Sequence, residues 1–523
     1  MHHLVRAFQD CSETNKFSIV PLTDQKYIAL EMGVVVGSYT TKKGITKTIY
    51  EYLRFVDSYK FLLMPLDKLA ANLPTDEFVY LDKQFATFSS AKRQLLKQKG
   101  FYPYSYADCF ERFDEKKLPP IHEWKSSLQN FKVSVTKDQF NHAKRVFHEF
   151  ECKTFGDYHD LYLLCDTLIL ASVFEHFRKV CFDTYKLDCC QFYTASNLTG
   201  SAFLKVCKPA LQLLTEREML DLTESMIRGG VSSIYAKRLC KANNRYLDTY
   251  DPTKESTFII CIDANNLYGG IMEKYNLPLC DFQWKQDPNL WTILNTPDSA
   301  DVGYILEVDL DYPDELHDLH ADYPLAPVKE AVPEAWLGEY QKSIMRNPPK
   351  SKKLLQTLHA KKIYVLHYTT LKLYVKLGLK VTEVHRVLQF KQSKWLKPYI
   401  ELNTQKRKEA EHKCDQDFFK LMSNSTYGKL CESKRNRIRV TLLRSENDLL
   451  QESQKPNFNH VKIVEENLAI SARKQSQIYW DKPTIVGAVV LDLAKAFMAD
   501  FHYNTMKPNF DCQLLYSDTD SFF

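Results

Sequence analysis

The feature that most constrains this chain lies near its C-terminus, where an apolar run leads into two carboxylates separated by one residue. The segment reads Leu515-Tyr516-Ser517-Asp518-Thr519-Asp520-Ser521. This order predicts a tight strand–turn–strand with the acids at its tip. Two acids held so close repel each other unless a cation lies between them, so the segment indicates a divalent metal site. The chain stops at Phe523 with the returning strand barely begun, and we expect a truncation there.

Length and composition place the chain among large globular proteins. Its 523 residues correspond to roughly three or four domains of about 150 residues, with 44% apolar and 26% charged residues. No apolar run reaches the ~18 residues of a membrane-spanning helix, and the N-terminus lacks the apolar core of a signal peptide. The 14 cysteines include no Cys-x-x-Cys pair. This argues against a zinc ribbon and favours free thiols in a reducing compartment.

The small net charge of +5 hides a sharp division along the chain. Residues 341–440 hold 24 Lys and Arg against 7 Asp and Glu (+17), whereas residues 281–340 hold 14 acids against 2 bases (−12). A positive surface concentrates polyanions, so the basic stretch favours nucleic acid over a merely solvated helical face. The acidic stretch is either solvated surface or a means of excluding DNA. Aromatic residues interleave with the basic ones: Tyr364, Tyr368, Tyr374, Trp395 and Tyr399.

The apolar patterns predict strands and helices that do not strictly alternate, which is typical of an α+β fold. Alternating and apolar runs bounded by turn residues predict the strands 17–20, 33–37 and 52–57. Apolar residues at steps of three and four predict helices over 66–73, 137–151, 157–182, 352–378, 396–430 and 485–503. The apolar segment 256–262 is predicted to be a buried strand, which would project Asp263 into a cleft.

Three segments carry chemistry: Asp263 to Gly269, Lys420 to Gly428, and the terminal acidic pair. On a helix, Lys420, Asn424 and Tyr427 lie at i, i+4 and i+7 and therefore share one face. That face offers a cation for phosphate, an amide for hydrogen bonding and a ring for stacking. Gly428 leaves room for close approach of a ligand to the backbone.

In this order the three segments resemble motifs A, B and C of family B DNA polymerases: Asp-x-x-Ser-Leu-Tyr-Pro, Lys-x-x-x-Asn-Ser-x-Tyr-Gly and Tyr-x-Asp-Thr-Asp-Ser. Motifs B and C match at every defined position, whereas Asn266 replaces the Ser and Gly269 the Pro of motif A. Ile227-Arg228-Gly229-Gly230 resembles the linker between exonuclease and polymerase in the protein-primed branch. That branch occurs in viruses, linear plasmids and self-synthesising transposons. The resemblance covers most of residues 50–523.

The resemblance implies nucleotidyl transfer with two Mg²⁺ ions, which Mn²⁺ would be able to replace. Asp263 and Asp520 would be the main ligands, with Asp518 assisting. Lys420 would pair with the triphosphate of the incoming deoxynucleotide. Arg407 is a second candidate for that contact, provided that the helical segment bends between the two residues.

The resemblance also implies contacts to the nucleotide and to DNA. The ring of Tyr268 would act as a steric gate that excludes a 2′-hydroxyl. The residues around the nascent base pair would be Leu267, Asn424, Tyr427 and Gly428. Those that contact the primer or template would be Tyr516, Arg228, Gly229 and Gly230.

An exonuclease domain of this family needs three acidic motifs. The third, Tyr-x-x-x-Asp, matches Tyr162 and Asp166 on an apolar helix. The first, Asp-x-Glu, does not occur before residue 160, and the second, Asn-x-x-Phe/Tyr-Asp, is also missing. We therefore expect an exonuclease remnant that has lost its N-terminal part and does not proofread.

The implied architecture is a partial ribonuclease H-like exonuclease domain followed by a family B palm and fingers, with the thumb missing. We expect the exonuclease-like domain in 1–215, palm with motif A in 216–280, an insertion similar to the terminal-protein region in 281–400, fingers with motif B in 401–435, and truncated palm with motif C in 436–523.

The implied partners are primer-template DNA, deoxynucleoside triphosphates and a terminal priming protein, with no membrane. The location would be intracellular, and nuclear if the source is an integrated transposon, which rests on analogy alone. Two alternatives stay open. One is a catalytically dead, DNA-binding remnant of a mobile element. The other is a reverse transcriptase, which also uses paired acids but usually shows them adjacent, whereas Thr519 intervenes here.

Overall fold

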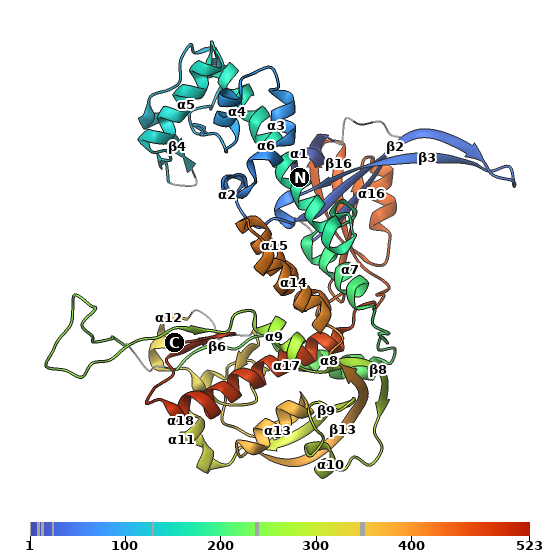
Figure 1. Ribbon diagram of the computed structural model, residues 1–523. Helices are drawn as coiled ribbons and strands as arrows, with labels where there is room; N and C mark the ends of the chain where they lie inside the picture. Colours follow the sequence, from blue (N-terminus) through green and yellow to red (C-terminus); the bar gives the residue numbers. More distant parts are fainter. Residues whose placement is uncertain are drawn as a thin grey trace. The chain divides into compact units, whose positions relative to one another are not determined.

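The computed structural model describes residues 2–7, 11, 15–23, 26–127, 130–235, 240–345 and 351–523. Helices and sheets are mixed along the chain, as predicted, and every strand pair among the described residues is antiparallel (Figure 1). The chain divides into two compact units. Unit 1 comprises 1–198, 404–421 and 437–475, and unit 2 comprises 199–403, 422–436 and 476–523.

The first sheet of unit 1 confirms the three strands expected near the N-terminus. Its order is β1 (Lys16–Pro21), β2 (Tyr27–Thr40) and β3 (Thr46–Val56). β2 and β3 are longer than predicted and continue beyond β1 as a two-stranded ribbon (Figure 1). Beyond β1 most ribbon side chains are exposed on both faces, so no single apolar face marks the strands in the sequence.

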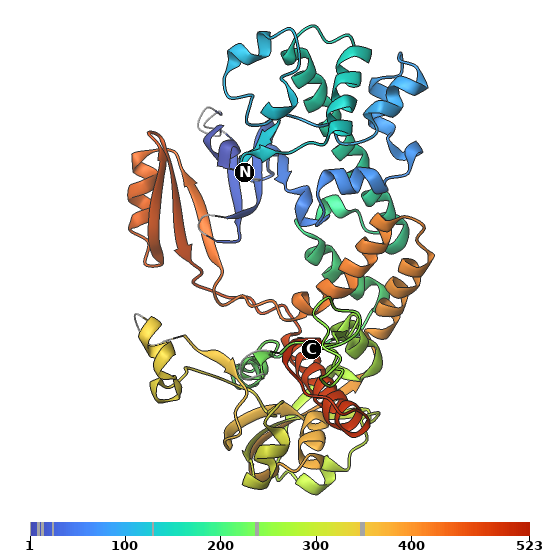
Figure 2. The same cartoon turned by 90° about the vertical axis from the view of Figure 1, so that its left-hand side faces the viewer.

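A second sheet of unit 1 comes from much later in the sequence. Its order is β14 (Ile438–Leu443), β16 (Leu468–Lys474) and β15 (Phe458–Glu465), with α16 (Glu446–Ser453) against it (Figure 2). Ile19 and Leu30 of the first sheet share a buried apolar cluster with Val440 and Ile470 of the second. The short α1 (His2–Ala7) adds Val5 to this core.

The remaining part of unit 1 is mostly helical, and its two longest helices begin where the sequence signals a cap. Thr136 and Gln139 form a capping box at the start of α5 (Lys137–Glu149), and Thr154 and Asp157 form another at α6 (Phe155–Tyr185). These helices confirm the predictions for 137–151 and 157–182. The other elements are η2 (Ser58–Lys60), α2 (Leu66–Asn72), η3 (Thr75–Glu77), α3 (Val79–Gln84), α4 (Ser90–Leu96), η4 (Phe110–Asp114), η5 (Ile121–Glu123), β4 (Lys125–Ser126), β5 (Lys132–Val133) and η7 (Cys189–Gln191).

Unit 2 is organised around a four-stranded sheet of order β12 (Lys361–His367), β9 (Val302–Asp311), β13 (Lys380–Ser393) and β8 (Leu277–Trp284). The α17 helix (Thr484–Asp500) packs on β8, β12, α8 (Arg217–Met226), α9 (Leu267–Lys274) and α13 (Tyr368–Lys376). Because it touches neighbours on all sides, nearly all its residues are buried. The structure confirms the long buried helix predicted over 485–503, which continues as a π-helical turn, η10 (Phe501–Met506).

The other elements of unit 2 are short. They are β6 (Ser232–Ile234), β7 (Ile262–Asp263), α10 (Leu290–Leu294), η8 (Asp314–Leu316), α11 (His317–His320), β10 (Val328–Glu330), η9 (Glu334–Trp336), α12 (Glu339–Ile344), β11 (Lys353–Leu355), α18 (Lys507–Asn509), β17 (Tyr516–Asp518) and β18 (Ser521–Phe522). Three helices cross the boundaries between the units: α7 (Ala195–Cys207), α14 (Lys397–Glu409) and α15 (Lys413–Leu430). The last two confirm the helical prediction for 396–430, with a break at 410–412.

Two predicted elements are wrong in part. The helix predicted over 352–378 is β11 and β12 followed by α13, because pairing of β12 with β9 overrides the local helical pattern. Of the buried strand predicted over 256–262, only the end is a strand. This is β7, which pairs with the two-residue strand β18. Phe258, Ile259 and Ile260 are therefore 59%, 47% and 65% exposed.

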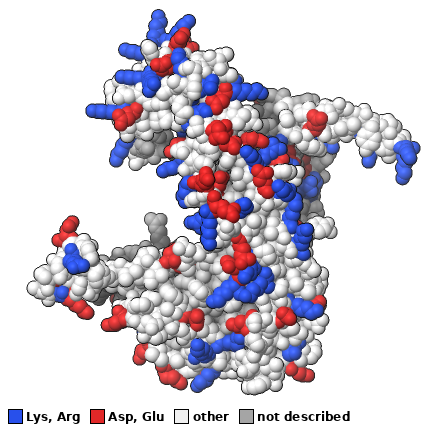
Figure 3. Space-filling model, viewed as in Figure 1, with Lys and Arg blue, Asp and Glu red and all other residues white. Residues whose placement is uncertain are grey.

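Some residues of the basic and acidic stretches form ion pairs with each other inside unit 2. The antiparallel sheet pairs Arg386 with Glu307, with N–O distances of 2.7 and 2.9 Å. It also pairs Lys362 with Asp309 and Lys391 with Asp281, both at 2.7 Å. Figure 3 accordingly shows charges of both signs intermingled on the face in view.

The aromatic residues that interleave with the basic ones are buried, so they cannot stack on nucleic acid. The interpretation that they mark a nucleic-acid surface is wrong. They are buried because they face the core from β12, α13 and the segment around α14. The five side chains are Tyr364, Tyr368, Tyr374, Trp395 and Tyr399.

All fourteen cysteines are free, as predicted. Among the described residues, no helix combines the length and the apolar character needed to cross a membrane.

Candidate active site

The terminal segment forms the predicted strand–turn–strand, and a small sheet in unit 2 surrounds it. The strand order is β6, β17, β18 and β7. β17 and β18 are the two arms of the hairpin, and Asp518 lies opposite Ser521. On the other side of β18, Ser521 lies opposite Asp263 of β7. The sheet therefore brings two segments that are about half the chain apart onto adjacent strands.

The three acids of motifs A and C form one negative centre. The backbone N–H of Ala264, which follows Asp263, donates to the carbonyl of Asp520 at 2.8 Å. Burial raises the pKa of the Asp520 carboxyl, and the negative charges of Asp263 and Asp518 raise it further. Asp520 thus feels the negative charge of both other acids, and a cation bound among them would cancel this repulsion.

This donor set fits a hard divalent cation, because carboxylate oxygens are the ligands that such ions prefer. The three carboxylates do not form a closed cage. Among the described residues, the groups whose ligand atoms all lie within 4.8 Å of one another are Asp188, Cys189 and Cys190, and Asp309, Glu383 and His385. The three acids of motifs A and C are not one of these groups.

The turn between the two acids is strained and is supported by the Gly-Gly motif. Thr519 adopts φ +56°, a left-handed conformation that a β-branched residue rarely takes. Its N–H donates to the carbonyl of Val231 at 2.7 Å. A Cβ on Gly230 would lie 2.4 Å from Thr519 Oγ1, so only glycine fits there. Gly229, at φ +94°, makes the turn that leads to this contact.

Arg228 anchors the same motif to the large sheet. Its guanidinium lies 3.9 Å above the ring of Tyr364 and donates to the carbonyl of Val365 at 2.9 Å. With this anchor, the structure gives Arg228, Gly229 and Gly230 a role in supporting the acidic turn. Their assignment to primer or template contacts stays a prediction.

Sequence reasoning missed a pair of charged residues next to this anchor. Asp492 and Lys495 lie on α17, and the positive charge of Arg228 acts on both of them. Burial raises the pKa of the Asp492 carboxyl and lowers the pKa of Lys495 to about 8. Asp492 accepts from the backbone N–H of His367 at 2.9 Å. An acid and a base three residues apart in an otherwise apolar helix were the available signal.

The two departures from motif A explain each other. Asn266 caps α9 from the left-handed conformation (φ +56°, ψ +53°), which asparagine tolerates better than most residues. Its side chain accepts from the N–H of Gly269 at 3.3 Å. A proline at position 269 would have no N–H to donate, and a Cβ there would lie 2.0 Å from Asn266 Nδ2.

The rings of Tyr268 and Tyr427 join motifs A and B. They stack with centroids 4.1 Å apart and planes 12° apart. Burial raises the pKa of Tyr268 to about 12, with a further contribution from the negative charge of Asp520. The charge of Asp520 therefore acts on the Tyr268 hydroxyl, and the role of this ring as a steric gate stays a prediction. The adjacent Leu267 is buried in the core, which leaves its backbone as the part available to a nucleotide.

The remaining residues of motif B lie along α15. Asn424 and Gly428 are exposed one turn apart, and a Cβ on Gly428 would meet nothing within 4 Å. Lys420 is exposed one turn before Asn424, but it belongs to unit 1 together with Arg407 of α14. The helical segment is interrupted at 410–412, between these two cations, and their contact with a triphosphate stays a prediction.

Tyr516 of motif C lies at the start of β17. Its hydroxyl is 3.3 Å from Ser232 Oγ, and its ring centroid is 5.5 Å from that of Phe523. Its role at the primer end stays a prediction.

The exonuclease motif residues Tyr162 and Asp166 lie on α6 in unit 1. Lys99 Nζ donates to Asp166 Oδ2 at 2.5 Å and to the Tyr162 hydroxyl at 2.9 Å. Sequence reasoning missed this lysine because it lies on a different segment, before α5. Lys99 and Asp166 therefore form an ion pair in which the positive charge offsets the negative one.

Comparison with known proteins gives one family and one kind of structure. The sequence profile described as DNA polymerase type B, organellar and viral, matches residues 15–478. No curated protein matches the chain. A Phi29 DNA polymerase complexed with primer-template DNA and incoming nucleotide substrates is similar, with 14% identity and a TM-score of 0.48. The match covers 97% of this chain and 65% of that one.

A Phi29 DNA polymerase complexed with primer-template DNA alone is similar to the same degree. It has 14% identity and a TM-score of 0.48, and the match covers 100% of this chain and 68% of that one. The chain thus spans about two thirds of the length of the structures that it matches.

Proposed function

The chain belongs to the organellar and viral type B DNA polymerases, and on this basis we propose that it forms the nucleotidyl-transfer site of a template-directed DNA polymerase. The reaction adds a deoxynucleotide to the 3′-hydroxyl of a primer. The observation that carries the proposal is the sheet β6-β17-β18-β7, in which Asp263 of β7 lies opposite Ser521 of β18, directly after the turn that joins Asp518 to Asp520. Their electrostatic coupling supports a common role.

In the proposed site, Asp263 and Asp520 are the main ligands of two divalent ions, Mg²⁺ or Mn²⁺, and Asp518 assists them. Bound ions would lower the pKa of the primer hydroxyl and neutralise charge on the triphosphate. The chain itself contributes the position of the carboxylates. The strained Thr519 turn and its contact with Gly230 keep Asp518 and Asp520 at the end of β17 rather than in a free loop.

The nucleotide would bind beside the stacked rings. Tyr268 lies next to the acids, so its ring is suited to contact the sugar and reject a 2′-hydroxyl. The Tyr427 ring stacks on the Tyr268 ring and so holds it in place. Asn424 and Gly428 would line the base pair with the backbone of Leu267. Lys420 and, as a second candidate, Arg407 would bind phosphate oxygens.

We assign the palm to the sheet β6-β17-β18-β7 with α9 and α17, and the fingers to α14 and α15. The helices around α6 would be the exonuclease-like part. The ion pair of Asp166 with Lys99 supports the absence of proofreading, since that carboxylate already has a cation. The partners would be primer-template DNA, deoxynucleoside triphosphates and, by analogy with the protein-primed branch, a terminal priming protein.

Primer extension with Mg²⁺ tests the proposal. We expect Asp263→Asn to lower the rate of incorporation by about 10²–10³-fold, as when a charged group that stabilises a transition state is removed. Asp314→Asn is the matched control, because that side chain is fully exposed on η8. Incorporation that survives Asp263→Asn contradicts the proposed site. DNA binding by the unaltered chain with no incorporation would instead favour the DNA-binding remnant.

A further inference from the structure

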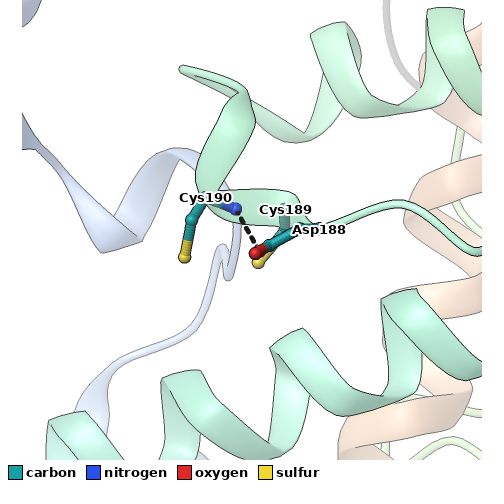
Figure 4. Close-up of side chains that lie close together, drawn as sticks. All are labelled: Asp188, Cys189 and Cys190. Atoms are coloured by element: carbon teal, nitrogen blue, oxygen red, sulfur yellow. Dashed lines mark hydrogen bonds between the residues drawn. The ribbon is translucent and has the colours of Figure 1, made fainter.

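A cluster of thiols in unit 1 is not used by the proposed polymerase site. Cys189 and Cys190 lie on η7, directly after Asp188, which caps this turn. A carboxylate oxygen of Asp188 and the two sulfur atoms all lie within 4.8 Å of one another. In Figure 4 both sulfur atoms point to the same side of the turn.

A third thiol comes from another element. Cys181, near the end of α6, shares a side-chain hydrogen bond with Cys189, and Cys189 makes one with Cys190. Cys181 and Cys189 are fully buried, whereas Cys190 is exposed. The three thiols therefore form one connected group, in which Cys190 is the residue that solvent can reach.

We propose that Cys181, Cys189 and Cys190 form a binding site for a thiophilic divalent metal ion of the zinc class, with Asp188 beside it. Zinc is bound by thiolates at about 2.3 Å, which in a tetrahedral site places the sulfur atoms about 3.8 Å apart. The sulfur atoms of Cys189 and Cys190 lie within 4.8 Å of each other, so a small movement of their side chains would bring them to this distance. Soft thiolate ligands select zinc and similar metals over Mg²⁺.

The surroundings of Asp188 supply the charge balance. Arg178 donates to Oδ1 from Nε at 2.9 Å and to Oδ2 from Nη2 at 2.6 Å. The N–H of Cys190 also donates to Oδ1, at 3.0 Å. A dication with three thiolates has a net charge of −1, and the charge of Arg178 offsets that of Asp188. Oδ2 accepts one of these hydrogen bonds and keeps a lone pair that would make Asp188 the fourth ligand.

The chemistry of binding is balanced by protons. The three thiols must lose their protons, so the dication replaces up to three protons and no electrons are transferred.

The second group with this spacing contains no thiol, and its aspartate is paired with a cation as Asp188 is with Arg178. In the group Asp309, Glu383 and His385, the Asp309 carboxylate already accepts from Lys362 at 2.7 Å, from the N–H of Ile363 at 2.8 Å and from His385 at 2.9 Å. The ammonium of Lys362 thus occupies the position that a metal ion would take. In the thiol cluster no cation contacts the sulfur atoms among the described interactions.

Titration of the reduced, chelator-treated chain with Co²⁺ tests the proposal. We expect one equivalent to give a saturable thiolate-to-cobalt charge-transfer band and the visible bands of tetrahedral cobalt, both of which Zn²⁺ removes. The double variant Cys189→Ser/Cys190→Ser should lose both signals. Cys109→Ser/Cys512→Ser is the matched control, since both of these thiols are exposed and lie outside the cluster.

Two further measurements keep the test decisive. Because Cys189 is buried, Cys190→Ser alone is included as a variant expected to fold, and its affinity for Co²⁺ should fall at least tenfold. Zn²⁺ should raise the unfolding temperature of the unaltered chain but not of Cys190→Ser, because a ligand stabilises the state that binds it.

The proposal is wrong if cobalt gives no charge-transfer band or if the band survives in the double variant. It is also wrong if the cysteines lose two hydrogens to a disulfide in air while the reduced chain binds no metal. None of these readouts depends on nucleotide incorporation, so they are independent of the proposed polymerase function.

Discussion

At the scale of single residues, the turn that carries Asp518 and Asp520 depends on the absence of a side chain at Gly230. Thr519 is fixed in a left-handed conformation, so its side chain cannot turn away from position 230 without moving the backbone. The Thr519 Oγ1, Cγ2 and Cβ atoms all lie within 3.1 Å of where a Cβ on Gly230 would be. A methyl group there would therefore displace the turn itself.

We accordingly predict that Gly230→Ala destabilises the protein by about 1–3 kcal/mol, the usual cost of overpacking, and lowers primer extension more than it lowers DNA binding. Adding Thr519→Gly should restore much of the stability, because it removes the clash and the strain together. Gly270→Ala is the control for stability, since a Cβ there meets nothing within 4 Å. Thermal unfolding of the four proteins is the measurement. Equal stability of Gly230→Ala and the unaltered chain would contradict this account of the turn.

The sequence predicted the identity of the motif residues but not what holds them. Asp263, Asp518 and Asp520 could be chosen because their spacing and order are distinctive. The support from Gly230, the anchor of Arg228 on Tyr364, and the neighbours Asp492 and Lys495 depend on contacts between segments far apart in the chain. Spacing along one segment cannot reveal such contacts.

At the scale of elements, local signals succeeded where helices begin and failed where strands pair. The starts of α5 and α6 are set by capping boxes within four residues, so they could be predicted. β12 was mistaken for a helix because the partner that makes it a strand, β9, lies about fifty residues earlier. β9 also supplies Glu307 and Asp309, whose ion pairs remove part of the basic surface inferred from composition.

His176 of α6 provides a prediction about how elements of unit 1 are joined. Its Nε2 lies 3.2 Å from Asp415 of α15, and its Nδ1 lies 3.6 Å from Glu77 of η3. Lys179 also contacts Glu77, at 3.3 Å. The hydrogen bond to Asp415 raises the pKa of His176 above its ordinary value, and the charge of Glu77 adds to this effect against the opposing effect of burial.

Because the folded pKa is raised, the stabilisation by His176 is fully present below the ~6.5 of an unfolded histidine and is lost as pH rises through the folded value. We predict that the free energy of unfolding measured with urea falls across this window, and that His176→Gln removes this part of the fall. His122→Gln is the matched control, as that histidine is exposed. If the free energy of unfolding falls equally in His176→Gln and in the unaltered chain, the contacts of His176 with Asp415 and Glu77 are not formed in solution.

At the scale of the whole molecule, net charge is a poor guide to where DNA binds. The chain has a net charge of only +5, and Lys362, Arg386 and Lys391 of the most basic stretch are paired with acids on neighbouring strands. The exposed cations Arg407 and Lys408 lie on α14, the helix proposed for the fingers, and have no such strand partners in the described part of the chain. They are therefore better candidates for phosphate contacts than the lysines of the sheet.

This distinction can be measured through the salt dependence of DNA binding. Each phosphate contact contributes about 0.9 to the slope of log affinity against log salt concentration. We predict that Arg407→Gln/Lys408→Gln lowers the slope for primer-template DNA by up to about 1.8, since each cation contributes one contact. The charge-matched control Lys362→Gln/Lys391→Gln should leave the slope unchanged, because these lysines neutralise Asp309 and Asp281. A slope that changes in the control but not in the α14 variant would place the DNA on the sheet, and the assignment of the fingers to α14 would be wrong.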